Sequence, residues 1–150
     1  MTQPTKRGEH DSGELTIRDV SAIMAKQDVA MVGTRHGDDV AVRPMSNNRD
    51  VEFDGDTYFF TTDDTTTVAD IKAHPRVSVS YADAEDDVFI AMTGTATLHT
   101  DRETQEKHWK PALEQWFEDG LDTEGLTLIR VNAERVHHWC GRDENELVLD

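Results

Sequence analysis

Five threonines stand close together between Thr61 and Thr67, after a very apolar stretch and before a predicted helix. Hydroxyl groups, together with the free N–H groups and positive dipole of a helix N-terminus, favour the binding of a phosphate group. Asp63 and Asp64 lie within the same stretch, and either carboxylate could cap the helix and occupy the place of a phosphate. The residues alone therefore indicate either a phosphate site or a self-capped helix.

Other residues with catalytic or metal-binding chemistry form no recognisable motif. Among seven histidines, the adjacent His137 and His138 would face opposite sides of a strand, which predicts one core and one surface histidine and no metal site. Cys140, the only cysteine, is interpreted as structural, because no base is predicted beside it. Carboxylates are so frequent that their pairing carries little information, and a hydrolase built on Asp or Glu stays an open alternative.

Short strands joined as hairpins must position the threonine stretch. Turn residues at 36–39 and 54–56 separate runs of β-branched and aromatic residues, which predicts two consecutive hairpins. Gly94, near the centre of the longest run, predicts a bulge. This pattern favours a mainly β fold, an antiparallel barrel with peripheral helices. The expected strands are Val29–Arg35, Val40–Met45, Val51–Phe53, Thr57–Thr61, Val77–Tyr81, Val88–Thr100, Leu126–Asn132 and Arg135–Trp139.

Three helical segments are expected around the barrel. A capping box of Thr16 and Asp19 begins the first, the second ends before Pro75, and the third is broken near Pro111. Their ranges are Leu15–Lys26, Thr67–Ala73 and Arg102–Glu118. The third segment carries aromatic residues that we interpret as core or dimer contacts, with a substrate platform as the alternative; these are Trp109, Trp116 and Phe117.

The formal net charge is −16, with 31 acidic residues against 15 basic ones spread along the chain. Such a charge repels itself, so that the compact state depends on screening by salt. We therefore expect a protein from a high-salt cytoplasm, with an ordinary acidic cytosolic protein as the alternative. No basic patch is visible in the sequence, which argues against nucleic acid and anionic membranes as partners.

A length of 150 residues predicts one domain. We divide the chain into a disordered N-terminal arm (1–13), a barrel domain (14–142) and an acidic C-terminal tail (143–150). No run reaches the roughly 18 apolar residues of a membrane span, and the first residues lack the apolar centre of a secretory signal. A single cysteine suits a reducing compartment, so a cytoplasmic location is expected.

Several motifs follow one another between about Leu15 and Trp139, and their order is more specific than any one of them. They are RPM at 43–45, DGDTYFFTT at 54–62, the threonine stretch, VADIKAHPRVSVSY at 68–81, the strand with Gly94, HWKPALEQWFEDG at 108–120 and VHHW at 136–139. This set resembles the general-stress-protein branch of the pyridoxamine 5'-phosphate oxidase-like FMN-binding split-barrel family. The resemblance implies a split β-barrel that forms a homodimer and binds FMN at the subunit interface.

The resemblance also implies where a flavin would lie. Residues 43–45 would follow the isoalloxazine ring, and the positive charge of Arg43 would stabilise the reduced flavin. Residues 60–62 match the strand end that leads to the ribityl phosphate, and Trp139 matches a closing aromatic that either approaches the partner's flavin or packs in the barrel. The matching positions are Arg43, Pro44, Met45, Phe60, Thr61, Thr62, Thr65, Thr67 and Trp139.

One position departs from the family pattern. Thr67 stands where the family often has Lys or Arg, and Asp63 and Asp64 lie nearby. Two like charges 4 Å apart repel by about 4 kcal/mol at an effective dielectric constant near 20. The departure therefore weakens the expectation that FMN occupies the site, although Lys72 or Arg76 could substitute for the missing cation.

Three functions follow from the resemblance. The first is a small FMN-dependent oxidoreductase, in which the flavin carries the electrons and the protein binds and shields it. The second is a flavin-binding or stress-associated module without turnover. The third keeps the barrel but binds a deazaflavin or haem, or no cofactor. No catalytic acid or base and no metal ligand is predicted.

Overall fold

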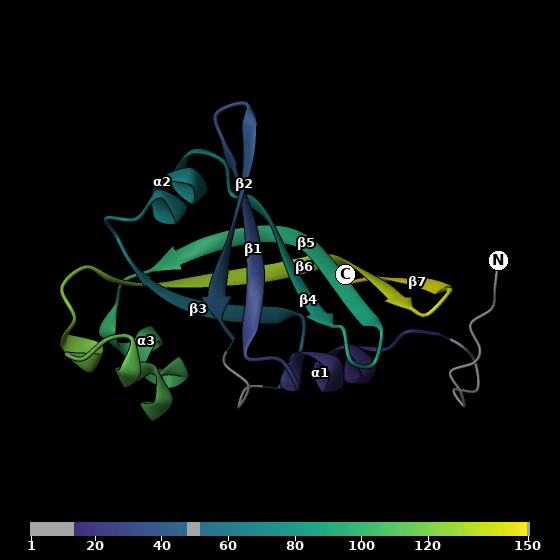
Figure 1. Ribbon diagram of the computed structural model, residues 1–150. Coiled ribbons are helices and arrows are strands. Elements are labelled where there is room, and N and C mark those ends of the chain that lie inside the picture. Colours follow the sequence, from purple (N-terminus) through teal and green to yellow (C-terminus); the bar gives the residue numbers. More distant parts are fainter. Residues whose placement is uncertain (1–13, 48–51, 150) are drawn as a thin grey trace.

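A computed structural model describes residues 14–47 and 52–149, which form one antiparallel sheet of seven strands flanked by short helices (Figure 1). The predicted mainly β fold with peripheral helices is confirmed. The strands are β1 Val29–His36, β2 Asp39–Ser46, β3 Asp56–Thr62, β4 Arg76–Asp83, β5 Val88–His99, β6 Leu126–Cys140 and β7 Asp143–Val148. The helices are α1 Ile17–Ala25, α2 Thr66–Ala73 and α3 Arg102–His108, with 3₁₀ helices η2 Pro111–Gln115 and η3 Gly120–Asp122.

The order of the strands is β2-β1-β4-β5-β6-β3, and β7 also pairs with β6. Strands β2 and β3 follow each other in the chain but lie at opposite ends of this order. The first predicted hairpin is confirmed, with Val32 opposite Arg43 and Gly33 opposite Val42. Strands β2 and β3 are the two end strands and do not pair with each other. The barrel is therefore split between them.

The second predicted hairpin is wrong, because strand β3 does not pair with the residues just before it. Residues 52–53 are not in a strand, and Val51 lies outside the described residues, as does the arm over 1–13. Strand β3 pairs instead with β6, with Thr57 opposite Val131. The turn before β3 also contacts β6, because Ala133 N donates to Gly55 O at 2.8 Å. A long apolar strand from the end of the chain thus replaces the local partner.

Strand β6 is continuous over 15 residues, whereas the sequence predicted two strands. Its first half pairs with β3 and its second half, Arg135–Cys140, pairs with β7. The acidic segment from 143 onward was predicted as a tail, but Asp143–Val148 is a strand. Its alternating pattern explains the pairing, since Leu147 packs against the core.

The bulge predicted at Gly94 is confirmed. Thr93 lies opposite Arg135 and Gly94 opposite Ala133, so that Glu134 is the extra residue. A Cβ atom on Gly94 would lie 2.0 Å from the carbonyl oxygen of Asn132. Only glycine allows the two strands to approach this closely.

The helices begin where their caps predict. Thr16 and Asp19 form the expected capping box of α1, and Pro111 stands in the first turn of η2, after the break that was expected there. Helix α1 places Val20 and Met24 in the core, which β-strand residues complete. The largest fully buried strand residues are Phe59, Tyr81, Ile90, Met92, Leu128 and Ile129. Among the described residues, no helix is long and apolar enough to cross a membrane.

We expect Gly94→Ala to lower the free energy of unfolding by about 1–3 kcal/mol or more, because the added methyl group overpacks the bulge. Denaturant unfolding in molar KCl measures the change. Thr93→Ala is the matched control, since Thr93 is exposed on the same strand. Equal stability of the two variants would contradict this account of the bulge.

Candidate functional site

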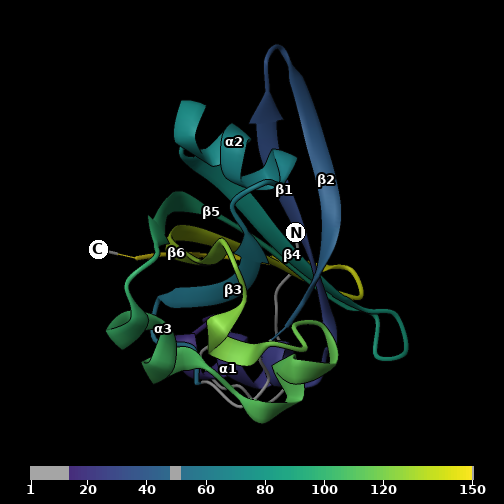
Figure 2. The same cartoon turned by 90° about the vertical axis from the view of Figure 1, so that its left-hand side faces the viewer.

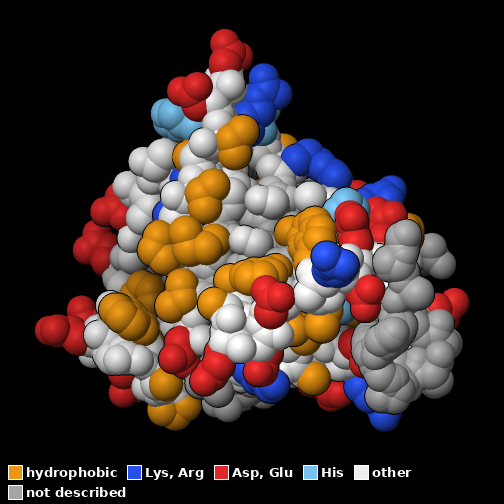
Figure 3. Space-filling view, turned by 45° about the vertical axis from the view of Figure 1, so that its right-hand side comes forward, with side chains coloured by type: hydrophobic (Ala, Val, Ile, Leu, Met, Phe, Trp, Pro, Cys, Tyr) orange, Lys and Arg blue, Asp and Glu red, His pale blue; other side chains and the backbone are white. Residues whose placement is uncertain are grey.

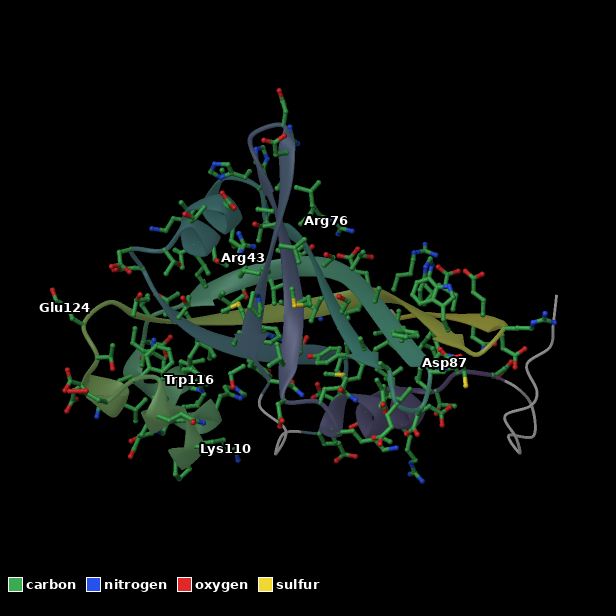
Figure 4. All side chains as sticks on the ribbon, in the orientation of Figure 1. Arg43, Arg76, Asp87, Lys110, Trp116 and Glu124 are labelled. Atoms are coloured by element: carbon green, nitrogen blue, oxygen red, sulfur yellow. The ribbon has the colours of Figure 1, made fainter. Side chains whose placement is uncertain are left out.

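A cleft of about 1080 Å³ lies beside the C-terminal end of β2. One wall comes from β1 and β2 and includes Pro44 and Met45, while Phe60 of β3 reaches it from across the split. The opposite wall comes from η2 and the residues after it, including Lys110 and Trp116. Figure 4 shows these two side chains on the same lower left part of the molecule. Three predicted site residues, Pro44, Met45 and Phe60, therefore meet in one cavity.

Aromatic contacts attach the η2 wall to β3. The rings of Phe60 and Trp109 meet edge to face with centroids 5.1 Å apart, and those of Trp109 and Phe117 are 6.0 Å apart. Trp116 differs, because 63% of its surface is exposed. Packing within the chain thus accounts for Trp109 and Phe117, whereas Trp116 is available to a ligand or partner.

A buried polar network supports the base of the cleft. The side-chain nitrogen of Asn47 donates to the carbonyl oxygens of Met24 and Gln27, each at 2.9 Å. Tyr81 donates to Asn47 Oδ1 at 3.4 Å. Burial raises the pKa of Tyr81 to about 12, so it stays a protonated donor. The network fixes the C-terminal end of β2.

The threonine stretch continues directly from β3 into α2, as predicted. The helix cap is Thr65, whose Oγ1 accepts from Val68 N at 3.3 Å, so the alternative in which Asp63 or Asp64 caps the helix is wrong. Asp64 instead accepts from Thr62 Oγ1 at 2.6 Å. A neutral hydroxyl therefore takes the capping position and leaves both carboxylates exposed beside the loop.

Both cations suggested as substitutes for the missing charge are exposed. Arg76 pairs with Glu134 at 2.8 Å. Lys72, the other, is exposed in the last turn of α2. Thr67 itself is buried, with 6% of its surface exposed. The loop thus offers threonine hydroxyls and helix N–H groups, next to negative charge.

Arg43 is directed toward α2. Its guanidinium donates to Thr34 Oγ1 at 2.7 Å and to Val32 O at 3.2 Å, and it lies 3.5 Å from Asp70 Oδ2 (Figure 4). Alternation along β2 explains this, because neighbours Pro44 and Arg43 project to opposite faces. Arg43 therefore lies between the cleft and the helix, and its positive charge is paired with the carboxylate of Asp70.

Asp70 is a site residue that the sequence did not reveal. Its carboxylate accepts from Thr34 Oγ1 at 2.7 Å and bonds His36 Nδ1 at 2.6 Å. Burial alone would raise the pKa of Asp70, but the hydrogen bonds from His36 and Thr34 outweigh it and hold the pKa below the usual value. The bond to Asp70 also raises the pKa of His36. A lone Asp in a short helix carries no signal of burial, so only the fold shows this cluster.

Trp139 does not join the cleft. It lies on the second half of β6, opposite Phe89 on one side and Glu144 on the other, and its ring packs on His137 with centroids 5.7 Å apart. Within one chain Trp139 is thus remote from Pro44 and Phe60. The prediction of one core and one surface histidine is confirmed for His138, which is buried, while His137 is half-buried with 42% of its side chain exposed. Across residues 14–47 and 52–149, no three ligating side chains gather to hold a metal ion.

The fold and these motifs define a family. Residues 16–149 match the model of the family described as pyridoxamine 5'-phosphate oxidase like, and the chain belongs to this family. The resemblance seen in the sequence is therefore confirmed.

One curated relative matches most of the chain. The chain is 25% identical over 132 residues to the protein bli-3 of Neurospora crassa, and the match covers 81% of this chain and 63% of that protein. The chain therefore spans less than two thirds of that relative.

Solved structures share the fold. One from Clostridium acetobutylicum, described as related to general stress protein 26, has a TM-score of 0.80 at 17% identity and covers 89% of this chain and 94% of that one. The general stress FMN/FAD binding protein of Xanthomonas citri has a TM-score of 0.68 at 23% identity, with coverage of 86% and 94%. The predicted split-barrel fold is thus confirmed.

We expect Thr65→Ala to lower the free energy of unfolding by about 1 kcal/mol, because it removes the cap of α2. Asp63→Asn and Asp64→Asn serve as controls and change stability less, since neither carboxylate caps the helix. Denaturant unfolding in molar KCl compares the three. A larger loss in either aspartate variant than in Thr65→Ala would contradict the assignment of the cap.

Proposed function

We propose that this chain binds FMN along the split between β2 and β3 and serves as a small flavin-dependent oxidoreductase. The isoalloxazine ring lies over Pro44 and Met45, and the phosphate reaches the loop between Thr62 and Thr67. One observation carries the proposal: Phe60 lines the cleft, and the same strand continues two residues later into the threonine loop. Strand β3 thus joins an apolar site for a ring to a donor-rich site for a phosphate. Figure 2 shows the course of the chain from β3 into α2.

The residues present fit a flavin mononucleotide, except that two carboxylates lie beside the proposed phosphate site. Apolar and aromatic side chains suit the ring, and hydroxyls with helix N–H groups suit the phosphate. When bound, the flavin supplies the electron transfer; the chain binds it, orients it and excludes water. Asp63 and Asp64 repel the phosphate, and mobile ions screen exposed charges more strongly as salt rises. Salt should therefore strengthen the binding of FMN.

We expect the Kd for FMN to fall about threefold to tenfold between 0.2 M and 2 M KCl, because screening weakens the repulsion from the loop. Asp64→Asn should tighten FMN binding at 0.2 M KCl and reduce this salt effect. Quenching of flavin fluorescence measures both.

Riboflavin, which lacks the phosphate, is the matched control ligand. Its affinity gives the effect of salt on the ring site and on the fold alone. If FMN and riboflavin respond equally to salt and to Asp64→Asn, the loop is not the phosphate site. If neither flavin binds at any salt concentration, the proposed function is wrong.

Turnover distinguishes an enzyme from a flavin-binding module. Bleaching of the bound flavin by NADH or NADPH under anaerobic conditions supports an oxidoreductase. A flavin that stays oxidised with both donors favours a module without turnover. Neutral groups dominate the cleft, which suits electron transfer with little proton chemistry from the protein.

We also propose that the chain forms a homodimer through the outer face of the β1–β2 hairpin. Val29 and Met31 of β1 and Val40 and Val42 of β2 are exposed by 40–79% on this face. They alternate with residues of the opposite face, so they form one surface. Hydrophobic side chains follow the hairpin down from its charged tip (Figure 3). An apolar patch on a chain of charge −16 supports the proposal of an interface here.

We expect Val42→Asp to convert the dimer to a monomer, because it buries a charge in the interface. Val148→Asp, with 58% exposure on β7, is the matched control and leaves the dimer intact. Sedimentation in 2 M KCl measures the mass. A wild-type monomer at micromolar concentration, or a dimer that survives Val42→Asp, would contradict this surface.

A further inference from the structure

Helix α2 carries a carboxylate that the proposed function does not use. Asp70 is 4% exposed and is surrounded by donors from the neighbouring hairpin. Thr34 and His36 come from β1, at 2.7 Å and 2.6 Å, and Arg43 comes from β2, at 3.5 Å. All three partners belong to one hairpin, so this single carboxylate ties the helix to it.

Such an attachment matters because α2 is short. It spans eight residues, and helices of this length are marginal without tertiary contacts. Its apolar contacts come from Val68 and Ile71, which are buried. Asp70 projects among them, and a buried carboxylate is tolerated only when it is hydrogen-bonded and paired. The orientation of α2 therefore depends on the donors that Asp70 meets.

The helix leads directly to the candidate phosphate loop. Thr65 caps α2 and also donates to Thr62 O at 3.0 Å, which closes the loop onto the helix. Thr67 lies three residues before Asp70, on the buried side. A shift of α2 would consequently move the hydroxyls and N–H groups that face a phosphate.

We propose that Asp70 is a positioning residue of this site, which fixes α2 and the Thr62–Thr67 loop on the β1–β2 hairpin, and that His36 makes this attachment depend on pH. The attachment of the helix needs no cofactor; only its effect on flavin affinity rests on the proposed function.

The charges around His36 set the direction of the effect. Its side chain is 60% exposed, with Asp70 on α2 and Asp39 and Arg43 on β2 acting on it. The hydrogen bond to Asp70 and the charge of Asp70 raise the pKa of His36 most, and Asp39 adds to them. Partial burial and Arg43 lower the pKa but do not outweigh Asp70. The charged bond is complete below the ordinary value of about 6.5 and is lost as pH rises through the raised pKa.

The opposite limit comes from Asp70. Its pKa is lowered in the fold, so its contribution is complete above the ordinary value of about 4 and is lost as pH falls through the lowered pKa. The attachment is therefore strongest between about pH 4 and pH 6.5 and weakens toward alkaline pH.

Hydrogen exchange of the α2 amides in the full-length chain tests the proposal. We expect protection, corrected for intrinsic exchange, to fall about tenfold from pH 6 to pH 8.5 in 2 M KCl, because the charged bond between His36 and Asp70 is lost over this range. His36→Gln, on an exposed side chain, should give low protection at every pH. His74→Gln is the matched control, because His74 follows α2 and its backbone N–H, which the substitution keeps, donates to Asp70 O at 2.7 Å. It should keep the wild-type profile.

FMN affinity gives the second readout. Titration of the FMN phosphate affects both proteins equally, so it cancels in the ratio of the His36→Gln Kd to the wild-type Kd. We expect the wild type to bind FMN about threefold or more tightly than His36→Gln at pH 6, and equally tightly at pH 8.5. Asp70→Asn should resemble His36→Gln if it folds; if it does not fold, His36→Gln decides.

Different outcomes overturn different claims. Equal, pH-independent protection of α2 in the wild type and His36→Gln overturns the positioning role. A change in protection without a change in the FMN ratio overturns the link to the cofactor site. Failure of the wild type to bind any flavin overturns the proposed function, while the exchange profile still decides the role of Asp70.

Discussion

Strand β6 is the element on which the rest of the structure depends. It pairs with β5 along one edge and with β3 and then β7 along the other. Because β3 is recruited to β6, it cannot close the sheet against β2, and both end strands face a shared opening. The cleft with Pro44, Met45 and Phe60 lies at this opening. The candidate site is therefore a consequence of strand pairing and not of a dedicated insertion.

Local signals in the sequence predicted much of the fold. The capping box at Thr16, the first hairpin and the glycine bulge each depend on neighbouring residues, and all three are present. The partner of β3 could not be predicted in this way, because it lies about 70 residues further along the chain. Likewise, Ala133-Glu134 looks like an interruption in the sequence, and only the contact of Gly94 with Asn132 shows that the strand continues.

The candidate site was predictable in outline from the resemblance, and its electrostatics were not. Pro44, Met45 and Phe60 meet as their motifs indicated. Arg43, however, pairs with Asp70, and no sequence motif pointed to Asp70. Local rules also misjudged the cap of α2, because they pointed to Asp63 or Asp64 and the cap is Thr65. Which of these adjacent residues caps the helix depends on where β3 ends, and the bond from Asp63 N to Gly125 O at 2.8 Å, just before β6, contributes to that.

The bulge at Glu134 divides β6 into two arms with separate neighbours. The arm before it carries β3 and the cleft, and the arm after it carries β7, Trp139 and the C-terminal end. A bulge raises the local twist of a strand and interrupts the ladder. Glu134 accepts hydrogen bonds from Arg76 on β4 and Thr95 on β5, so its side chain ties the bulge to two other strands. This one extra residue thus sets the angle between the half of β6 that carries the cleft and the half that carries β7, and with it the direction of β3 beside the split.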